Sequence, residues 1–566
     1  MMKFSEYEYK RPNFETFKAK ADKEITRLKE AGDGDEAIAA VTQVQSLIVE
    51  MEKQGNISYI RHSINTKDSF YEAENDYWDE YGPLFEEVFQ GYYRAIMESD
   101  FRTDLETVLP KQYFKMISYK LKAFSPEIVG LLQKENEWAS KYNKLVASAK
   151  IEFDGKTMNL SQLTPYQQST DRSVRQAASE AYYGFFEENE TKFDEIYDQL
   201  VKTRHEMALT LGFKDFVELG YIRMERYDYD REMVQVFREE VLKEVVPVTN
   251  KLYDRQAKRI GVDDMQYYDL NLNFLNGNAT PKGDPAYIME MGKKMYHELS
   301  PETGHFIDYM YDHELLDLET KEGKASGGYC TFIPEYDSPF IFANFNGTSG
   351  DIDVLTHEAG HAFQVFESRW IKQPELVFPT SESAEIHSMS MEFFTYPWME
   401  LFFKEETEKY KYAHLAGALQ FIPYGVLVDH FQHEVYENPE MTPAERKATW
   451  RKLEKMYNPH KDYSENSFLD QGALWFRQGH IFDTPFYYID YTLAQVCAFQ
   501  FWKRAIHDND PDAWNDYLEI CKKGGTESFL KLVETANLKS PFEEGSLTEM
   551  VQAIDEALSA VDDLNL

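Results

Sequence analysis

The sequence predicts a mostly α-helical protein with a small β-sheet, divided into two lobes. Over most of the chain, apolar residues recur every three or four positions, as in the stretches at 14–31 and 36–54. This spacing places them on one face of a helix. With 566 residues and 43% hydrophobic content, the chain is longer than the size at which single cores usually stop growing. We therefore expect two lobes, with room for a deep site between them.

The first helical stretch runs from Asn13 to about Lys150, and we interpret residues 1–150 as an N-terminal helical lobe. The segment IEFDGKTMNLSQL at 151–163 then places an Asp-Gly pair between two short alternating runs. Such a pair is a strong signal for a β-hairpin. We place the boundary there, so residues 151–566 form the second region and contribute to both lobes.

Within the second region, helical periodicity is interrupted at two places. Gly, Asn and Pro cluster in NFLNGNATPKGDP at 273–285, which is typical of a surface loop. GGYCTFI at 327–333 and PFIFANF at 339–345 are short runs rich in aromatic and β-branched residues. These runs predict a small sheet immediately before the motif that carries the chemistry.

The charge balance excludes several kinds of partner. The chain has 99 acidic residues against 60 Lys and Arg, a net charge of -39, which repels nucleic acid and anionic membrane surfaces. The start of the sequence lacks a basic segment followed by an apolar one, and no stretch has eighteen consecutive apolar residues. Because Cys330, Cys497 and Cys521 are few and odd in number, free thiols in a reducing compartment are expected. We expect a cytoplasmic protein without nucleic acid or membrane partners.

The motif His-Glu-Ala-Gly-His at 357–361 is the strongest functional signal in the chain. It lies in TSGDIDVLTHEAGHAFQVF, where Ser349 is expected to cap a helix and apolar residues follow a helical spacing. His357 and His361 are four apart, so both imidazoles leave one helix face and can share one zinc ion. Glu358 then lies beside the metal, where a carboxylate can take a proton from water.

A chance match is the alternative explanation of this motif. His-Glu pairs also occur at positions 205, 297, 313 and 433, and none of them has a second His at the fourth position. The complete pattern is therefore unusual within this chain. Gly360 adds weak support, because glycine inside a helix costs about 1 kcal/mol relative to alanine and usually reflects close packing.

A catalytic zinc site with two His ligands needs a third protein ligand. The following helical segment, TSESAEIHSMSMEFF, has Glu385 and Glu392 seven apart on one face. We assign Glu385 as the third ligand and Glu392 as the acceptor for the N–H of a ligand imidazole. A solvated carboxylate on the helix face remains an alternative for Glu392.

HEAGHAF followed by AEIHSMSME resembles the active-site helices of the thimet oligopeptidase and oligoendopeptidase F family of zinc metallopeptidases. The residues that match the ligand, base and helix positions of that family are His357, Glu358, Gly360, His361, Glu385 and Glu392. Thimet-type members often have a further His where this chain has Gln364, which favours the oligoendopeptidase F branch. The resemblance implies a two-lobed helical body around a deep substrate channel, with the small sheet beside the zinc site.

A third block, GALWFRQGHIFDTPFYYIDYTLAQV at 472–496, resembles the family segment whose His and Tyr residues stabilise the tetrahedral intermediate. The resemblance implies that role for His480, Tyr488 and Tyr491. His480 is one position out of step with thimet-type members, and Thr484 stands where another family Tyr would be. Neutral O–H and N–H donors stabilise a developing oxyanion strongly in a dry cleft. The alternative is that these aromatic residues only form a core patch on a helix.

The leading hypothesis is a zinc-dependent oligopeptidase with one Zn²⁺ per chain that hydrolyses internal bonds of short unstructured peptides. Residues 151–566 would then be the catalytic zinc-peptidase region. A zinc carboxypeptidase or another exopeptidase with the same metal site is a close alternative. A noncatalytic acidic helical protein with a structural zinc is less consistent with Glu358, because a closed structural site has no use for a base. Cleavage preference, oligomeric state, and replacement of zinc by cobalt or manganese remain open.

Overall fold

The computed structural model describes residues 2–321, 323–325 and 327–566. The chain is 69% helical, with one two-stranded and one three-stranded sheet in the described part. This confirms the prediction of a mostly helical protein with a small sheet. Among the described residues, no helix combines the length and the apolar content needed to cross a lipid bilayer.

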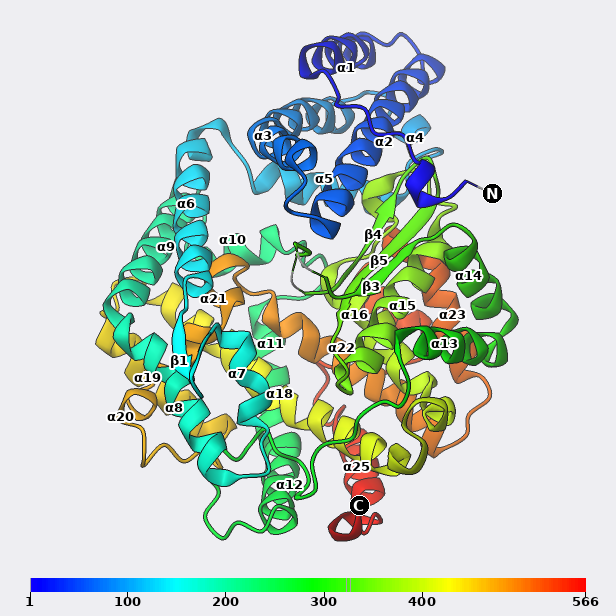
Figure 1. Ribbon diagram of the computed structural model, residues 1–566. Helices are drawn as coiled ribbons and strands as arrows, with labels where there is room; N and C mark the ends of the chain where they lie inside the picture. The colour runs from blue at the N-terminus through cyan, green and yellow to red at the C-terminus, as the bar shows by residue number, and fades with distance from the viewer. Residues whose placement is uncertain (1, 322, 326) are drawn as a thin grey trace. The chain divides into compact units, whose positions relative to one another are not determined.

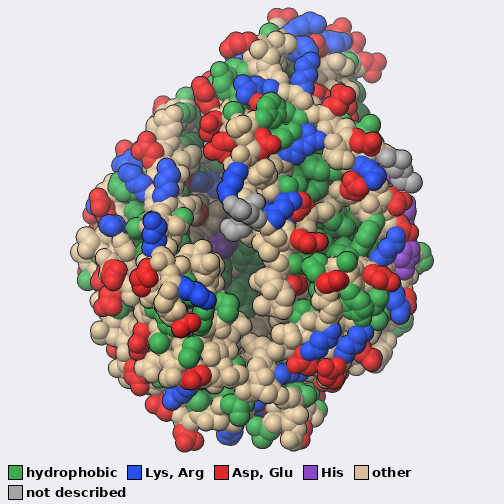
Figure 2. Space-filling model, viewed as in Figure 1, with side chains coloured by type: hydrophobic (Ala, Val, Ile, Leu, Met, Phe, Trp, Pro, Cys, Tyr) green, Lys and Arg blue, Asp and Glu red, His purple; other side chains and the backbone are tan. Residues whose placement is uncertain are grey.

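The chain folds into two compact units, each assembled from three separate segments. The first unit consists of Met1–Lys122, Thr280–Lys404 and Arg504–Leu538, and the second of Ala123–Ala279, Glu405–Lys503 and Lys539–Leu566. Acidic and basic side chains are spread over the visible face rather than gathered by sign (Figure 2). The predicted division of the sequence at residue 150 stays a prediction.

The first unit contains helices from all three of its segments and the three-stranded sheet (Figure 1). Its helices are α1 (Phe14–Lys29), α2 (Gly34–Ile64), α3 (Ser69–Met97), α4 (Arg102–Leu105), α5 (Lys111–Lys122), α13 (Pro285–Leu299), α14 (Pro301–Asp312), α15 (Gly350–Ser368), α16 (Ser381–Phe394), α17 (Glu400–Phe403), α23 (Ala513–Lys523) and α24 (Phe529–Thr535). Its strands are β3 (Leu316–Glu319), β4 (Tyr329–Ile333) and β5 (Ser338–Phe345).

The three-stranded sheet has the order β3-β5-β4. β4 pairs antiparallel with β5, with Tyr329 opposite Phe342, and β3 pairs parallel with β5. β5 is buried along nearly all its length, which explains why the sequence from Pro339 to Ala343 is a continuous apolar run rather than an alternating one. The two strands predicted at 327–333 and 339–345 are confirmed. The sheet packs on α15, which also contacts α16 and α23.

The second unit is helical except for one hairpin. Its elements are α6 (Val129–Ala147), β1 (Ile151–Phe153), β2 (Lys156–Met158), α7 (Leu160–Gln167), α8 (Arg172–Glu188), α9 (Glu190–Thr210), α10 (Phe216–Arg223), α11 (Arg231–Glu240), α12 (Val246–Arg259), α18 (Thr407–Glu437), α19 (Pro443–Tyr457), α20 (Ser467–Asp470), α21 (Gly479–Asp483), α22 (Tyr488–Trp502) and α25 (Thr548–Ser559).

The predicted hairpin is confirmed, with Ile151 opposite Met158 in an antiparallel pair. Its two turn residues, Asp154 and Gly155, have φ angles of 50° and 71°. Asp-Gly tolerates this left-handed conformation, which matches the twist of the flanking strands. The predicted loop at 273–285 contains neither helix nor strand before α13 begins at Pro285.

A buried arginine joins four helices in the second unit. Arg204 of α9 is fully buried; its Nε donates to Oε1 of Glu135 in α6 at 2.6 Å, and another nitrogen donates to the Tyr436 hydroxyl of α18 at 2.8 Å. A third nitrogen donates to the backbone oxygen of Phe482 in α21. Burial alone raises the pKa of Glu135, but Arg204 and Arg223 reverse the shift and lower it. The carboxylate is therefore charged and matched by its partners.

We expect Arg204→Met to destabilise the second unit by about 3–5 kcal/mol, because it leaves Glu135 charged and buried without its main partner. Lys202→Met is the control, since Lys202 lies on the same helix but is 55% exposed. The ion pair that Lys202 forms with Asp198 should contribute at most about 1 kcal/mol to stability. Urea unfolding followed by circular dichroism measures both changes, and equal shifts in the two variants would contradict the network's role.

Candidate metal centre

Helix α15 carries the His-Glu-Ala-Gly-His motif and begins beside the end of β5. Ser349 occupies the N-cap position, but its side chain makes no capping hydrogen bond, so the predicted capping role is wrong. Asp351 makes a different contact: its carboxylate accepts from the backbone N–H groups of Asn346 and Gly347, before the helix, at 2.8 and 2.7 Å. The loop between β5 and α15 is thereby tied to the first turn of the helix.

Gly360 allows α15 and α16 to cross at very short distance. A Cβ atom at this position would lie 2.6 Å from the backbone oxygen of His387 and 2.6 Å from Cα of Ser388. Real Cβ atoms do not approach backbone this closely, so any larger residue would push the helices apart. Close packing thus explains the glycine inside the helix.

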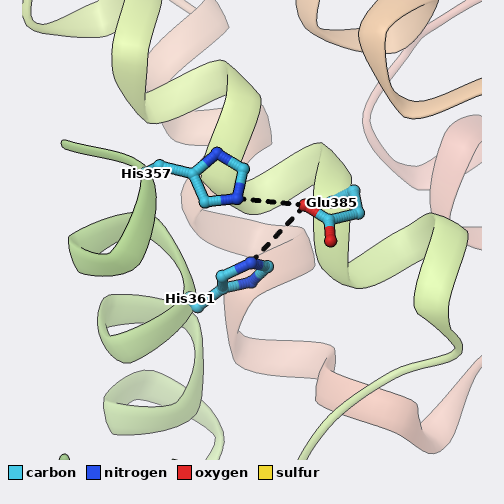
Figure 3. Close-up of side chains that lie close together, drawn as sticks. All are labelled: His357, His361 and Glu385. Atoms are coloured by element: carbon cyan, nitrogen blue, oxygen red, sulfur yellow. Dashed lines mark ion pairs between the residues drawn. The ribbon is translucent and has the colours of Figure 1, made fainter. Parts of the chain in front are cut away.

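The crossing brings together His357, His361 and Glu385 (Figure 3). Oε2 of Glu385 lies 3.2 Å from Nε2 of His357 and 3.5 Å from Nε2 of His361. Ligands at about 2.1 Å from a tetrahedral ion stand about 3.4 Å apart. The three donor atoms, all within 4.8 Å of one another, therefore fit a single small metal ion.

Two neighbouring side chains orient these donors. Nδ1 of His357 lies 2.7 Å from Oε1 of Glu392, and Oγ of Ser388 donates to Oε2 of Glu385 at 2.8 Å. With Glu392 on Nδ1, the other ring nitrogen of His357 is directed at Glu385. His361 differs, because its Nδ1 is buried and has no hydrogen-bond partner in the described part of the chain.

The electrostatics of the group call for a positive charge. Burial lowers the pKa of His357, but hydrogen bonds to Glu385 and Glu392 outweigh it and raise the pKa well above its usual value. Burial raises the pKa of Glu385, but His361 and His357 hold it well below its usual range. Either an imidazolium or a metal ion can supply that charge, and a metal ion would displace the proton on binding.

Glu358 lies next to this group and is buried, with only 8% of its surface exposed. Burial raises its pKa, and His361 and His357 partly oppose the shift. Its Oε2 has no hydrogen-bond partner within the part of the chain that the structure describes. A Cβ atom at Gly328 would lie 3.5 Å from Oε1 of Glu358, so a glycine here leaves space beside the carboxylate.

The other predicted site residues lie in the second unit and form a group of their own. The ring of His480 in α21 packs against two tyrosines of α22, with centroids 5.1 Å from Tyr488 and 6.0 Å from Tyr491. Nδ1 of His480 lies 2.9 Å from Nε2 of Gln478. Burial lowers the pKa of His480 and raises that of Tyr488. At neutral pH both groups are therefore uncharged.

Two residues that shape the metal centre were not predicted from the sequence. Ser388 lies three positions after Glu385, on the same side of α16, and this spacing could have revealed its hydrogen bond. Gly328 could not be found in this way, because its approach to Glu358 depends on how the sheet packs on α15. On the same helix, the backbone oxygen of His387 accepts a hydrogen bond from the Tyr517 hydroxyl of α23 at 2.9 Å. This hydrogen bond joins α16 to α23.

Comparison with known proteins identifies the family. The Peptidase M3 N-terminal domain matches residues 4–124, and Peptidase family M3 matches residues 165–552. A solved structure, PZ peptidase A with inhibitor 2, is 55% identical, with a TM-score of 0.94 over 99% of this chain and 100% of that chain. A protein from Bacillus anthracis str. Ames, provisionally named oligoendopeptidase F, is 52% identical, with a TM-score of 0.90 over the full length of both chains.

A curated relative, the oligoendopeptidase F homolog of Borreliella burgdorferi, is 23% identical over 379 residues. The match covers 64% of this chain and 61% of that protein, so the chain spans about three fifths of this relative's length. The fold and the metal-binding group define a metallopeptidase-like protein. The chain belongs to peptidase family M3, a family that implies a metal ion.

We expect Gly360→Ala to weaken binding of a divalent metal ion by about tenfold or more, because separating α15 from α16 moves Glu385 away from the two imidazoles. Gly91→Ala in α3 is the matched control, since a Cβ there meets no atom within 4 Å. The control should leave metal affinity unchanged and stabilise its helix by up to about 1 kcal/mol. Chelator competition with Zn²⁺ measures the affinity, and an unchanged value for Gly360→Ala would refute the dependence on the crossing.

Proposed function

We propose that this protein is a zinc-dependent oligopeptidase that cleaves internal bonds of short, unstructured peptides. The observation that carries the proposal is the donor group of His357, His361 and Glu385, with the buried carboxylate of Glu358 beside it. Membership of peptidase family M3 and relatives named oligoendopeptidase F support it.

Two imidazole nitrogens and one carboxylate oxygen are a ligand set that suits zinc and leaves a coordination position open. His357, His361 and Glu385 would hold the ion, with Glu392 fixing the ring of His357 and Ser388 fixing the carboxylate. When bound, zinc polarises water and the peptide carbonyl and makes the water more acidic.

Glu358 supplies the base for this chemistry. Its carboxylate accepts a proton from the attacking water as the water oxygen bonds to the peptide carbon. The same proton then passes to the amide nitrogen as the C–N bond breaks, so that the amine leaves neutral. Burial keeps bulk water away from this carboxylate, and Gly328 leaves room beside it for substrate backbone.

His480, Tyr488 and Tyr491 are proposed to donate hydrogen bonds to the oxygen that becomes negatively charged during attack. Support comes from their clustering, from the uncharged state of the His480 imidazole and Tyr488 hydroxyl, and from the resemblance in sequence. Neutral donors can stabilise a developing oxyanion without holding a permanent charge in the site.

Short peptides are the proposed substrates because a peptide without folded structure can present a strand to a partly buried carboxylate and metal group at little cost. The excess of acidic residues opposes binding of nucleic acid and anionic membranes.

We expect zinc-loaded protein to release internal fragments from a defined peptide mixture, measured by mass spectrometry, and Glu358→Gln to lose at least about a hundredfold in kcat, since an amide cannot accept the proton. Glu358→Gln should keep the metal. Glu385→Gln is the contrasting variant and should lose zinc on dialysis, because it removes an anionic ligand. Release of single terminal residues would instead favour an exopeptidase, and near-normal kcat in Glu358→Gln would remove it as the base.

For the tyrosines, we expect Tyr488→Phe or Tyr491→Phe to lower kcat by about tenfold to thousandfold, as for loss of one oxyanion donor. KM should change less, because the oxyanion develops mainly in the transition state. Tyr166→Phe in α7 is the control for loss of a phenol in the same unit. If both α22 variants retain full kcat, these residues belong to an aromatic core patch.

A further inference from the structure

Arg477 of the second unit differs from the buried arginines around it. It ends a short 3-10 helix (Leu474–Arg477), two residues before α21 begins. Within the described part of the chain, no ion pair joins it to a carboxylate. Buried arginines of the same unit each have an acidic partner, in the pairs Arg204–Glu135, Arg226–Asp490, Arg238–Asp429 and Arg446–Asp198.

The surroundings of Arg477 are aromatic rather than acidic. Its guanidinium carbon lies 5.8 Å from the ring centroid of Tyr424. Tyr183 raises the pKa of Arg477 most, burial lowers it, and Tyr424 and Tyr182 raise it further. The side chain is nevertheless exposed to solvent. Arg477 is therefore a cation that solvent reaches and that has phenol groups around it.

A second cation, Lys461, contacts the ring of Tyr424. Nζ of Lys461 lies 4.9 Å from the ring centroid of Tyr424 and 3.5 Å from Oε1 of Glu454. Glu454 is already shared, because Arg451 contacts its other oxygen at 3.2 Å. Burial lowers the pKa of Lys461 to about 8, and Arg477 adds to the shift although Glu454 opposes it. Lys461 and Arg477 together therefore carry more positive charge than the shared carboxylate of Glu454 balances.

Tyr424 and Gln478 connect the two cations to the His480 group. The Tyr424 hydroxyl donates to Oε1 of Gln478 at 2.9 Å, and Nε2 of Gln478 lies 2.9 Å from Nδ1 of His480. The Tyr424 ring also meets the Tyr488 ring edge to face, with centroids 5.9 Å apart. A peptide whose carbonyl reaches His480 and Tyr488 would therefore extend towards, or start from, the two cations.

We propose that Arg477, assisted by Lys461, binds a carboxylate of the peptide substrate and so makes the enzyme selective for peptides that carry one at a set distance from the cleaved bond. The proposal rests on the proposed peptidase function. A guanidinium presents two parallel N–H donors to a carboxylate, and the surrounding tyrosines reduce competition from water. The chain as a whole repels anions, with a net charge of -39. Arg477 and Lys461 supply local positive charge that can bind an anionic group of a peptide.

The carboxylate can come from the peptide C-terminus or from an Asp or Glu side chain, and matched substrates separate these sources. One peptide is prepared with a free C-terminal carboxylate and with a C-terminal amide. A second series of amidated peptides carries either Glu or Gln at one position, and that position is varied on both sides of the cleaved bond. Steady-state kinetics of zinc-loaded wild type, Arg477→Gln, Arg477→Lys and the charge-matched control Lys452→Gln are compared; Lys452 is an exposed residue of α19.

We expect wild type to favour one carboxylate form over its neutral partner by about tenfold to hundredfold in kcat/KM, as for a hydrogen bond to a charged group. Arg477→Gln should abolish this preference by raising KM for the carboxylate peptide, with kcat and the neutral peptide changed less than about threefold. Arg477→Lys should keep part of the preference, and Lys452→Gln all of it. A purely structural role of Arg477 would instead affect charged and neutral peptides alike.

Binding measured separately from cleavage distinguishes this proposal from the proposed function. Calorimetric titration of the same peptides into Glu358→Gln protein, with and without Arg477→Gln, requires no turnover. Charge-dependent binding that Arg477→Gln removes would uphold the carboxylate site even if no peptide were cleaved. Equal affinity for charged and neutral peptides in Glu358→Gln protein, or a preference that survives Arg477→Gln, would overturn it even if cleavage were normal.

Discussion

The contact between α15 and α16 at Gly360 is the constraint on which the metal centre depends. Each helix supplies donors that are ordered within it, two imidazoles one turn apart on α15 and two carboxylates two turns apart on α16. Only the approach of the helices turns these rows into one group, and that approach leaves no space for a Cβ atom at residue 360. The sheet on one side of α15 and α23 behind α16 hold the crossing in place.

Negative charge around the two imidazoles gives the centre its affinity for a cation. Glu385 faces both rings, and Glu392 contacts the far nitrogen of His357. Such a group is unfavourable without a compensating positive charge, because burial weakens its solvation. Glu358 lies beside it with one oxygen uncommitted among the described residues. The same arrangement that attracts a metal ion therefore keeps a proton acceptor next to it.

The second unit handles charge in a different way. Most of its buried arginines are matched by carboxylates, and these pairs join helices that are distant in sequence, as Arg204 does with α6, α18 and α21. Arg477 is surrounded by phenols instead, and Lys461 shares Glu454 with Arg451. The other buried arginines of this unit have their own carboxylate partners, so Arg477 and Lys461 are the cations that can bind a ligand.

Much of the candidate site could be predicted from short spacings in the sequence. A separation of four fixes His357 and His361 on one helix face, and a separation of seven does the same for Glu385 and Glu392, because helix geometry depends on local spacing alone. The hairpin at Asp154 and Gly155 follows from the φ angles that those residues tolerate. The expected cap at Ser349 failed because Ser349 itself has helical φ and ψ angles of -54° and -28°, whereas a capping residue usually lies in the extended region.

The sequence by itself determined the class of the fold, the helix faces and the residue types suited to a metal. The tertiary structure decided which imidazole Glu392 contacts, why residue 360 is glycine, that Gly328 lies at Glu358, and that each unit is assembled from three separated segments. These features depend on contacts between segments far apart in the chain. Their geometry is set by how whole elements pack and close loops, which no local spacing of residues specifies.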